Sequence, residues 1–370
     1  MSGRSEPADR LVRSDLRSLE GYHSPQLEVE VRLNTNEAPV GPPTAFVEAY
    51  TAAVSEIEWH RYPDREARAL REAIAAMHDV EPAQILVANG SNEILQTICL
   101  TFAGAGRSVM TFEPTYAMHG QIARTTQCEV VEIDRGEGFV LDPGVLGDAL
   151  ADRKPNVVFL CSPNNPTGTA ETLQNVELAV ASTSGVVVVD EAYAQFASFS
   201  ALDVLERRGG AEADVAMLVT RTFSKTWSMA GTRLGYVVGP SWMITEMEKV
   251  LLPYHLDSAK QLAGTIALDF QDEMNERVAS IIEQRGRVSA ALLSLGVEVW
   301  PSQSNFILFC TSPTGQTGDE VWQALVDRSV LVRNCSSWPR LSDCLRVTVG
   351  SPADNDRFIQ ALTDVLSAHS

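Results

Sequence analysis

Residues 157–168 read VVFLCSPNNPTG, and residues 186–193 read VVVVDEAY. Each stretch begins with a short apolar run that is rich in β-branched residues. Apolar and polar residues do not alternate in these runs. Such runs are typical of strands that crossover helices bury on both faces. A polar turn follows each run directly. The two stretches therefore predict strands of a parallel α/β sheet with polar side chains at their carboxyl ends.

Similar runs occur on both sides of these stretches, separated by longer segments with helical patterns. The expected strands cover residues 85–88, 108–112, 130–133, 157–160, 186–189, 217–220 and 234–238. After about residue 242 helical patterns come first, and a few strands follow around NFILFC, VLVRN and LRVTVG. The sequence thus predicts an α/β fold in three parts: an N-terminal arm over residues 1–32, a large α/β domain with a largely parallel central sheet over 33–245, and a smaller C-terminal α+β domain over 246–370.

The composition excludes several classes of protein. Among 370 residues, 48 acidic side chains outnumber 29 basic ones, and 45% of the residues are hydrophobic, which excludes a disordered chain. The negative charge would repel phosphate backbones and anionic lipids, so we expect neither a nucleic-acid partner nor a membrane. The six cysteines form no C-x-x-C pair, and the first residues lack the apolar core of a signal peptide. We therefore expect a cytoplasmic protein with reduced thiols.

Polar groups follow the predicted strands where open α/β sheets bind ligands. The strand 85–88 is followed by NGSNE, whose backbone N–H groups can bind an anion or simply cap a helix. Asp190 ends a buried strand and therefore needs a cation or a donor, a need that a purely structural acid would share. Lys225 follows another buried strand, and Arg233 comes eight residues later. An isolated lysine is ordinarily a solvated surface charge, but this context argues against that interpretation.

An anion cradle, an acid, a lysine and an arginine in one crevice suit a cofactor that carries a phosphate, a protonatable ring nitrogen and an aldehyde. Pyridoxal phosphate has all three groups. Its chemistry needs a lysine for the Schiff base and an acid that keeps the ring nitrogen protonated. The sequence contains no H-E-x-x-H motif and no clustered His and Cys residues, so we expect no metal.

With these features, the sequence resembles the fold-type I pyridoxal-phosphate aminotransferases and, within them, the histidinol-phosphate aminotransferase family. The resemblance covers nearly the whole chain, and the order and spacing of its motifs are more specific than any one of them. The motifs are LNTNEAPVGPP (33–43), HRYPD (60–64), NGSNEIL (89–95), EPTYAMH (113–119), SPNNPTG (162–168), DEAY (190–193), TFSKTWSMAGTRLGY (222–236) and LVRNCSSWPRLSDCLRVTVG (331–350).

The resemblance implies a role for each matching residue. Lys225 would form the Schiff base and then move a proton between the substrate Cα and the cofactor, and Asp190 would pair with the ring nitrogen. Asn165 and Tyr193 would hydrogen-bond the ring hydroxyl, and Tyr116 would stack on the ring. The implied phosphate ligands are Ser91, Asn92, Thr222, Ser224 and Arg233.

The resemblance also implies substrate-binding residues and a partner. Arg346 matches the clamp for a substrate α-carboxylate, and Arg333 matches the arginine that meets the substrate phosphate or the side-chain carboxylate of glutamate. Tyr22 matches a tyrosine near that distal group. Tyr62 matches a tyrosine that reaches the phosphate from the neighbouring subunit, so a homodimer with shared active sites is implied. Tyr62 and Tyr116 could instead simply pack in the core, which is the ordinary role of a tyrosine. An isolated arginine ordinarily forms a surface ion pair.

The implied activity is transfer of an amino group between L-histidinol phosphate and 2-oxoglutarate in histidine biosynthesis. Asn334 replaces a more usual acidic residue, and the cluster Asn334, Cys335, Ser336 and Ser337 is similar to that of threonine-phosphate decarboxylases, which leaves such a decarboxylase open. An aromatic or broad-specificity aminotransferase is a further alternative. A nicotinamide dehydrogenase could be suggested from AGAGR (103–107), but that segment lacks the third glycine of the motif. The retained lysine, aspartate and arginines argue against a non-catalytic, ligand-sensing relative.

Overall fold

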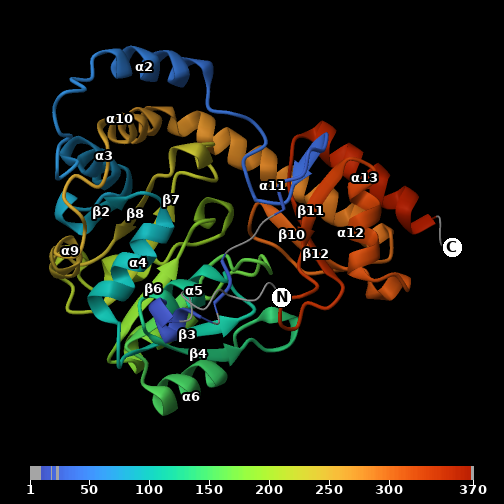
Figure 1. The fold of residues 1–370 in the computed structure, drawn as a ribbon, viewed down its shortest axis with the longest axis horizontal. Helices are drawn as coiled ribbons and strands as arrows, with labels where there is room; N and C mark the ends of the chain where they lie inside the picture. Colours follow the sequence, from blue (N-terminus) through green and yellow to red (C-terminus); the bar gives the residue numbers. More distant parts are fainter. Residues whose placement is uncertain (1–9, 18, 22–24, 368–370) are drawn as a thin grey trace.

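Two sheets lie side by side in the computed structural model, which describes residues 10–17, 19–21 and 25–367 (Figure 1). In this part of the chain the larger sheet has seven strands, in the order β2-β8-β7-β6-β5-β3-β4. Each of them coincides with a strand expected from the sequence, and the predicted α/β class is confirmed. The strands are β2 (Ile85–Ala88), β3 (Ser108–Glu113), β4 (Glu129–Asp134), β5 (Val157–Cys161), β6 (Val186–Asp190), β7 (Met217–Thr222) and β8 (Gly235–Val238).

The larger sheet is parallel apart from one strand. β3 pairs in parallel with β4 and β5, and β6 pairs in parallel with β5 and β7. β8 is antiparallel to both of its neighbours, β7 and β2. The carboxyl ends of β5, β6 and β7 therefore meet at one edge of the sheet, as the prediction of a largely parallel sheet requires.

Helices cover both faces of the larger sheet, which explains why its central strands are apolar throughout. In β5, Val157 and Phe159 belong to the core on one face, whereas Val158 and Leu160 belong to the core on the other. The helices that contribute to the first core are α4 (Ser91–Phe102), α5 (Met118–Thr125) and α9 (Ser241–Glu248). Those that contribute to the second include α6 (Pro143–Arg153), α7 (Leu173–Ser182) and α8 (Leu202–Arg207).

The smaller sheet has the strand order β1-β11-β12-β10-β9 among the described residues. Its strands are β1 (Val31–Leu33), β9 (Glu298–Val299), β10 (Phe306–Cys310), β11 (Val330–Asn334) and β12 (Cys344–Thr348), and its helices are α11 (Gln271–Ser294), α12 (Gly318–Val326) and α13 (Pro352–Ser367). A capping interaction marks the start of α13, because Ser351 Oγ donates to Asp354 Oδ2 at 2.6 Å and the backbone N–H of Asp354 donates to Ser351 Oγ at 3.2 Å.

The division of the chain at residues 32 and 245 stays a prediction, and contacts cross both boundaries. β1 lies at the first boundary and pairs with β11 of the smaller sheet. Helix α10 (Ser258–Ala267) lies beyond the second, yet it packs against α2 (Thr44–Ser55) and α3 (Arg68–His78). A single turn then leads from α10 into α11, so a nearly continuous helical run joins the two sheets (Figure 1). Within the described residues, no helix has the length and apolar character needed to cross a bilayer.

Candidate active site

A cavity of about 540 Å³ opens at the carboxyl ends of β5, β6 and β7 and faces the smaller sheet. Tyr22 lies outside the described residues. Tyr62 lies on the surface, 79% exposed, and stacks on Tyr254 with ring centroids 4.5 Å apart. All the other residues predicted for the site line the cavity, namely Ser91, Asn92, Tyr116, Asn165, Asp190, Tyr193, Thr222, Ser224, Lys225, Arg233, Arg333 and Arg346.

The start of α4 forms one side of an anion cradle. Gly90 precedes the helix with a φ of +84°, and a Cβ at this position would lie 2.9 Å from Arg233 Nη2. A Cβ on Gly235 of β8 would lie 2.6 Å from the backbone nitrogen of Ser91. The two glycines therefore let Arg233 and β8 approach the helix start closely. Backbone N–H groups and a guanidinium meet there, which is the donor set that a phosphate needs.

Two buried hydroxyl groups form the other side of the cradle. Thr222 ends β7 and Ser224 follows it, and the Thr222 hydroxyl donates to Ser224 Oγ at 3.0 Å. The backbone N–H of Ser224 donates to Thr222 Oγ1 at 3.1 Å, and Arg233 Nη1 donates to Ser224 Oγ at 3.5 Å. Arg233 therefore contacts both sides of the cradle.

Lys225 follows the cradle and points into the cavity. Its Nζ donates to the backbone carbonyl of Thr35 at 3.1 Å and lies 5.7 Å from the centroid of the Tyr193 ring. Burial, followed by the positive charge of Arg346, lowers the pKa of Lys225 to about 7, and Arg233 acts in the same direction. A large fraction of this side chain is thus a neutral amine at neutral pH, which is the form that attacks a carbonyl carbon.

Asp190 ends β6 and is 2% exposed. His119 Nε2 lies 2.9 Å from one carboxylate oxygen of Asp190, and the Thr220 hydroxyl donates to the other at 3.0 Å. The His119 ring is held in turn by stacking on Phe159, with centroids 4.7 Å apart. These contacts fix the orientation of a buried carboxylate that faces the cavity.

The two predicted substrate arginines lie directly opposite each other on neighbouring antiparallel strands. Arg333 of β11 and Arg346 of β12 are partners in the register, and both line the cavity. Arg346 Nη1 donates to Asn165 Oδ1, and its Nη2 donates to the backbone carbonyl of Asn34 at 2.9 Å. The Arg333 guanidinium lies over the ring of Trp338, 5.4 Å from its centroid. The smaller sheet therefore presents two guanidinium groups to the cavity that holds Lys225.

The sequence model of the family "Aminotransferase class I and II" matches residues 28–362. The chain belongs to this family. It is 42% identical to the histidinol-phosphate aminotransferase of Frankia casuarinae, over 96% of this chain and 90% of the relative. It is also 42% identical to that of Thermobifida fusca, over 96% of this chain and 95% of the relative. The predicted family and enzyme class are confirmed.

A solved structure shows the same fold. The histidinol-phosphate aminotransferase of Sinorhizobium meliloti, in complex with pyridoxal-5'-phosphate, superposes with a TM-score of 0.88 at 22% identity, over 100% of both chains. Membership of the aminotransferase family confirms the predicted cofactor, pyridoxal phosphate. The residues of this aminotransferase fit that group, because a phosphate cradle, a buried carboxylate and an amine of lowered pKa line one cavity.

Two residues that contact the predicted site were missed at the sequence level. His119 belongs to EPTYAMH and contacts Asp190, and Asn36 belongs to LNTNEAPVGPP and donates from Nδ2 to Tyr193 Oη at 2.9 Å. Both lie in motifs that carry the resemblance, and that was the only signal that could have found them. Burial raises the pKa of Tyr193, and the Asn36 bond opposes that change.

His119, Cys161 and Asp190 form a further group that the sequence spacing did not indicate. One ligand-type atom from each lies within 4.8 Å of the other two. Burial and the charge of Asp190 raise the pKa of the Cys161 thiol, so this sulfur stays protonated and is a poor metal ligand. His119 already contacts Asp190. The group therefore lies at the wall of the cavity, which Cys161 and Asp190 line.

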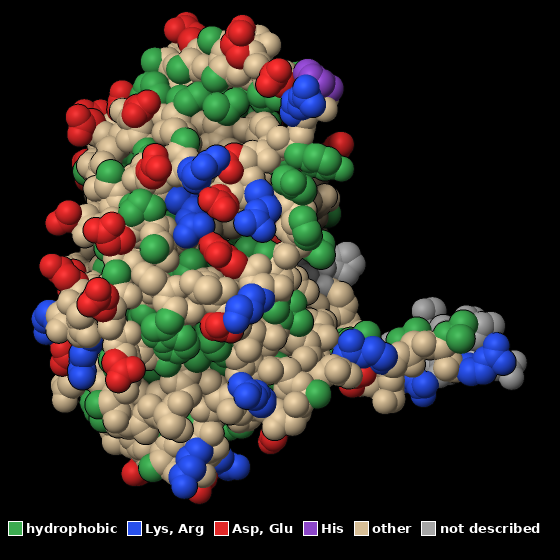
Figure 2. Space-filling view, turned by 90° about the vertical axis from the view of Figure 1, so that its left-hand side faces the viewer, with side chains coloured by type: hydrophobic (Ala, Val, Ile, Leu, Met, Phe, Trp, Pro, Cys, Tyr) green, Lys and Arg blue, Asp and Glu red, His purple; other side chains and the backbone are tan. Residues whose placement is uncertain are grey.

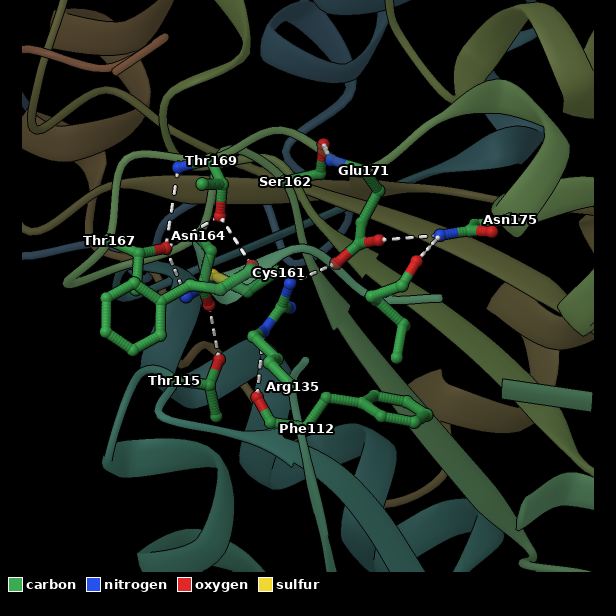
Figure 3. Close-up of polar contacts among 12 residues, drawn as sticks. Phe112, Thr115, Arg135, Cys161, Ser162, Asn164, Thr167, Thr169, Glu171 and Asn175 are labelled. Carbon is green, nitrogen blue, oxygen red and sulfur yellow. Dashed lines mark hydrogen bonds and ion pairs between the residues drawn. The ribbon is translucent and has the colours of Figure 1, made fainter. Parts of the chain in front are cut away.

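The loop that carries Asn165 is held by a buried polar network (Figure 3). The Thr115 hydroxyl donates to Asn164 Oδ1 at 2.7 Å, and Asn164 Nδ2 donates to Thr167 Oγ1 at 2.8 Å. The backbone N–H of Glu171 donates to Ser162 Oγ at 3.1 Å. These bonds fix the loop on both sides of Asn165, whose amide oxygen then receives the bond from Arg346.

Proposed function

We propose that this aminotransferase transfers the amino group of L-histidinol phosphate to 2-oxoglutarate, giving imidazole acetol phosphate and L-glutamate, a step of histidine biosynthesis. The pair of arginines carries the proposal, since Arg333 and Arg346 line the cavity that contains Lys225. The names of the relatives support it: two at 42% identity over nearly the whole chain are histidinol-phosphate aminotransferases.

The residues that would hold pyridoxal phosphate are those that line the cavity. Ser91, Asn92, Thr222, Ser224 and Arg233 would bind its phosphate, Asp190 its ring nitrogen, and Asn165 and Tyr193 its ring hydroxyl, while Tyr116 would stack on the ring. When bound, the cofactor supplies an aldehyde that condenses with amines and a ring that accepts electron density from the substrate Cα.

The chain's own groups then hold and move protons. Asp190, which His119 and Thr220 orient, would accept a hydrogen bond from the protonated ring nitrogen. Lys225 would accept a proton from the substrate Cα and return it, and its lowered pKa suits it to this role near neutral pH. Arg346 orients the α-carboxylate of glutamate through a planar pair of donors.

The same cavity must accept two dissimilar substrates in turn. Arg333 would meet the side-chain carboxylate of glutamate in one half of the reaction and the phosphate of histidinol phosphate in the other. A guanidinium suits both anions because its N–H groups match either geometry. Trp338 lies against this guanidinium and fixes its position in the cavity wall.

We also propose a homodimer with shared active sites, located in the cytoplasm. Tyr62 is 79% exposed and stacks on Tyr254, so the chain presents an ordered aromatic pair at its surface. Such a pair suits an interface from which Tyr62 reaches the phosphate site of a second copy. All six cysteines are free and buried, as suits a reducing compartment.

Spectroscopy of the half-reactions tests the function. L-histidinol phosphate and L-glutamate should each convert the absorbance of the bound cofactor without any second substrate, and O-phosphothreonine should not. The variant Lys225→Ala is the control, and it should lose both turnover and the absorbance of the lysine-bound cofactor. Release of CO₂ from O-phosphothreonine would overturn the proposal in favour of a decarboxylase. Full activity of Lys225→Ala would contradict the assignment of Lys225.

A further inference from the structure

The loop between β11 and β12, residues 335–343, reaches across to the larger sheet. Arg340 in this loop donates from Nη1 to Asp134 Oδ1 at 3.1 Å and to the backbone carbonyl of Arg135, and from Nη2 to the carbonyl of Gly136 at 3.4 Å. Its guanidinium also lies over the ring of Phe139, 5.7 Å from the centroid. All four partners belong to residues 134–139, which end β4 and follow it. We call this set of contacts the Arg340 clasp.

Buried contacts of the Arg135 side chain hold the segment 134–139 on the larger sheet. The Arg135 side chain is 2% exposed, its Nε donates to the carbonyl of Phe112 at 3.0 Å, and its Nη1 lies 2.6 Å from Glu171 Oε1 (Figure 3). Asn175 Nδ2 donates to the other oxygen of Glu171 at 3.2 Å. The buried ion pair between Arg135 and Glu171, together with these hydrogen bonds, fixes the backbone at Arg135. The carbonyl that accepts from Arg340 is therefore a fixed docking point on the larger sheet.

The same loop carries Trp338, which lines the cavity. Trp338 lies two positions before Arg340, and the Arg333 guanidinium rests on its ring. Within the loop, the Trp338 N–H donates to the carbonyl of Cys335 at 2.9 Å, and the Leu341 N–H donates to the carbonyl of Trp338 at 3.1 Å. The two bonds make one compact turn around Trp338. A shift of Arg340 would therefore move Trp338 and the guanidinium that it supports.

We propose that Arg340 is a positioning residue for the distal anion of the substrate. By fastening the loop to the end of β4, the clasp sets the distance between Arg333 on the smaller sheet and Lys225 on the larger one. This inference rests on the proposed function, because that function assigns the distal anion to Arg333. An exposed ion pair alone contributes little, but a planar guanidinium that meets a carboxylate, two carbonyls and a ring at once fixes a loop, and an ammonium cannot reproduce that set.

The experiment compares the holoenzyme with its Arg340→Met variant in single half-reactions, followed by the cofactor absorbance. With L-glutamate or L-histidinol phosphate, the apparent dissociation constant should rise about ten-fold, while the limiting rate changes little. With L-alanine, which has no distal anion, both constants should stay unchanged. Arg340→Lys should give an intermediate loss. Arg207→Met is the matched control, because Arg207 forms an exposed ion pair with Glu177 away from the cavity.

A double mutant decides whether Arg340 acts through Arg333. In an Arg333→Met background, Arg340→Met should have no further effect on glutamate binding. An equal loss with alanine and glutamate, or additive losses in the double mutant, would overturn the inference. If Arg340→Met fails to fold, Arg340→Lys in the same two tests decides. Failure of the wild type to react with histidinol phosphate would instead contradict the proposed function, and the glutamate and alanine comparison would still test the clasp.

Discussion

Burial lowers the pKa of Lys225 more than any single neighbouring charge does. Burial is the main cause of the lowered pKa of Lys225, Arg346 comes next, and Glu37 opposes both. Arg346, for which we propose binding of the substrate carboxylate, therefore also lowers the pKa of the amine. Under that proposal, a single positive charge would couple substrate binding to the reactivity of Lys225.

We predict a pH dependence at this residue. The fraction of Lys225 that is a neutral amine increases as the pH rises through its pKa of about 7. The cofactor-free enzyme should therefore capture pyridoxal phosphate about ten-fold faster at pH 8 than at pH 6. Stopped-flow absorbance measures this rate. In Arg346→Met the midpoint should move to higher pH, because a nearby positive charge is lost. A wild-type midpoint above pH 9 would contradict the prediction.

Part of the site could be predicted one residue at a time and part could not. Asp190 and Lys225 each come at or soon after the end of an apolar run, and Arg233 comes just before the next run, so their places near strand ends are visible in the sequence. His119 is 71 positions from Asp190, and only the packing of α5 against the sheet brings their side chains together. No local pattern encodes such a contact. The role of Tyr22, which lies outside the described residues, stays a prediction.

At the scale of elements, the phosphate cradle depends on the fit between α4 and β8. Ala88 of β2 and Gly235 of β8 are register partners, so the start of β8 lies beside the turn that begins the helix. A Cβ on Gly235 would lie 2.8 Å from the carbonyl carbon of Gly90 and 3.0 Å from the carbonyl oxygen of Arg221. These neighbours are backbone atoms, so they could move away from an added Cβ only if the cradle itself were displaced.

Substitution of this glycine should weaken cofactor binding. In Gly235→Ala the added methyl group would push Ser91 away from β8, and we expect the dissociation constant of pyridoxal phosphate to rise about ten-fold or more. Titration of the cofactor-free enzyme by absorbance measures it. Gly147→Ala is the control, because Gly147 lies in α6 with nothing within 4 Å of its added Cβ. Unchanged affinity in Gly235→Ala would show that the cradle tolerates the methyl group.

The elements themselves and the largely parallel character of the larger sheet were predictable, whereas the order of its strands and the direction of β8 were not. Seven apolar runs gave the strands of the larger sheet because two-sided burial leaves a clear pattern. The same run would look alike in either direction, so nothing marked β8 as antiparallel. β1 has only three residues and pairs with a strand near the other end of the chain, which places it beyond local patterns.

At the scale of the whole molecule, the surface carries several large exposed aromatic residues. Figure 2 shows one face, on which Lys and Arg side chains are interspersed with Asp, Glu and hydrophobic side chains. Tyr62 and Tyr254 are exposed by 79% and 42%, and Trp59, three positions before Tyr62, by 72%. Exposed aromatic side chains of this size are typical of surfaces that a partner covers.

Mixing two inactive variants tests the shared site. If Tyr62 completes the phosphate site of a second copy, Tyr62→Ala and Lys225→Ala should each lose most activity alone. A mixed dimer contains one intact site, so an equal mixture should regain about one quarter of the wild-type activity by random pairing. Assays after co-refolding measure this, and sedimentation of the wild type should give twice the chain mass. No recovery on mixing, with dimers present, would place Tyr62 outside the site.

The pairing of β1 with β11 has a consequence for biosynthesis. Leu33 is made early and lies opposite Val332, so about 300 residues must leave the ribosome before the two strands can meet. The smaller sheet is therefore finished last, after the larger one has all its strands. Because β11 carries Arg333, a deletion that removes β1 would damage the wall of the cavity that a distant part of the chain builds.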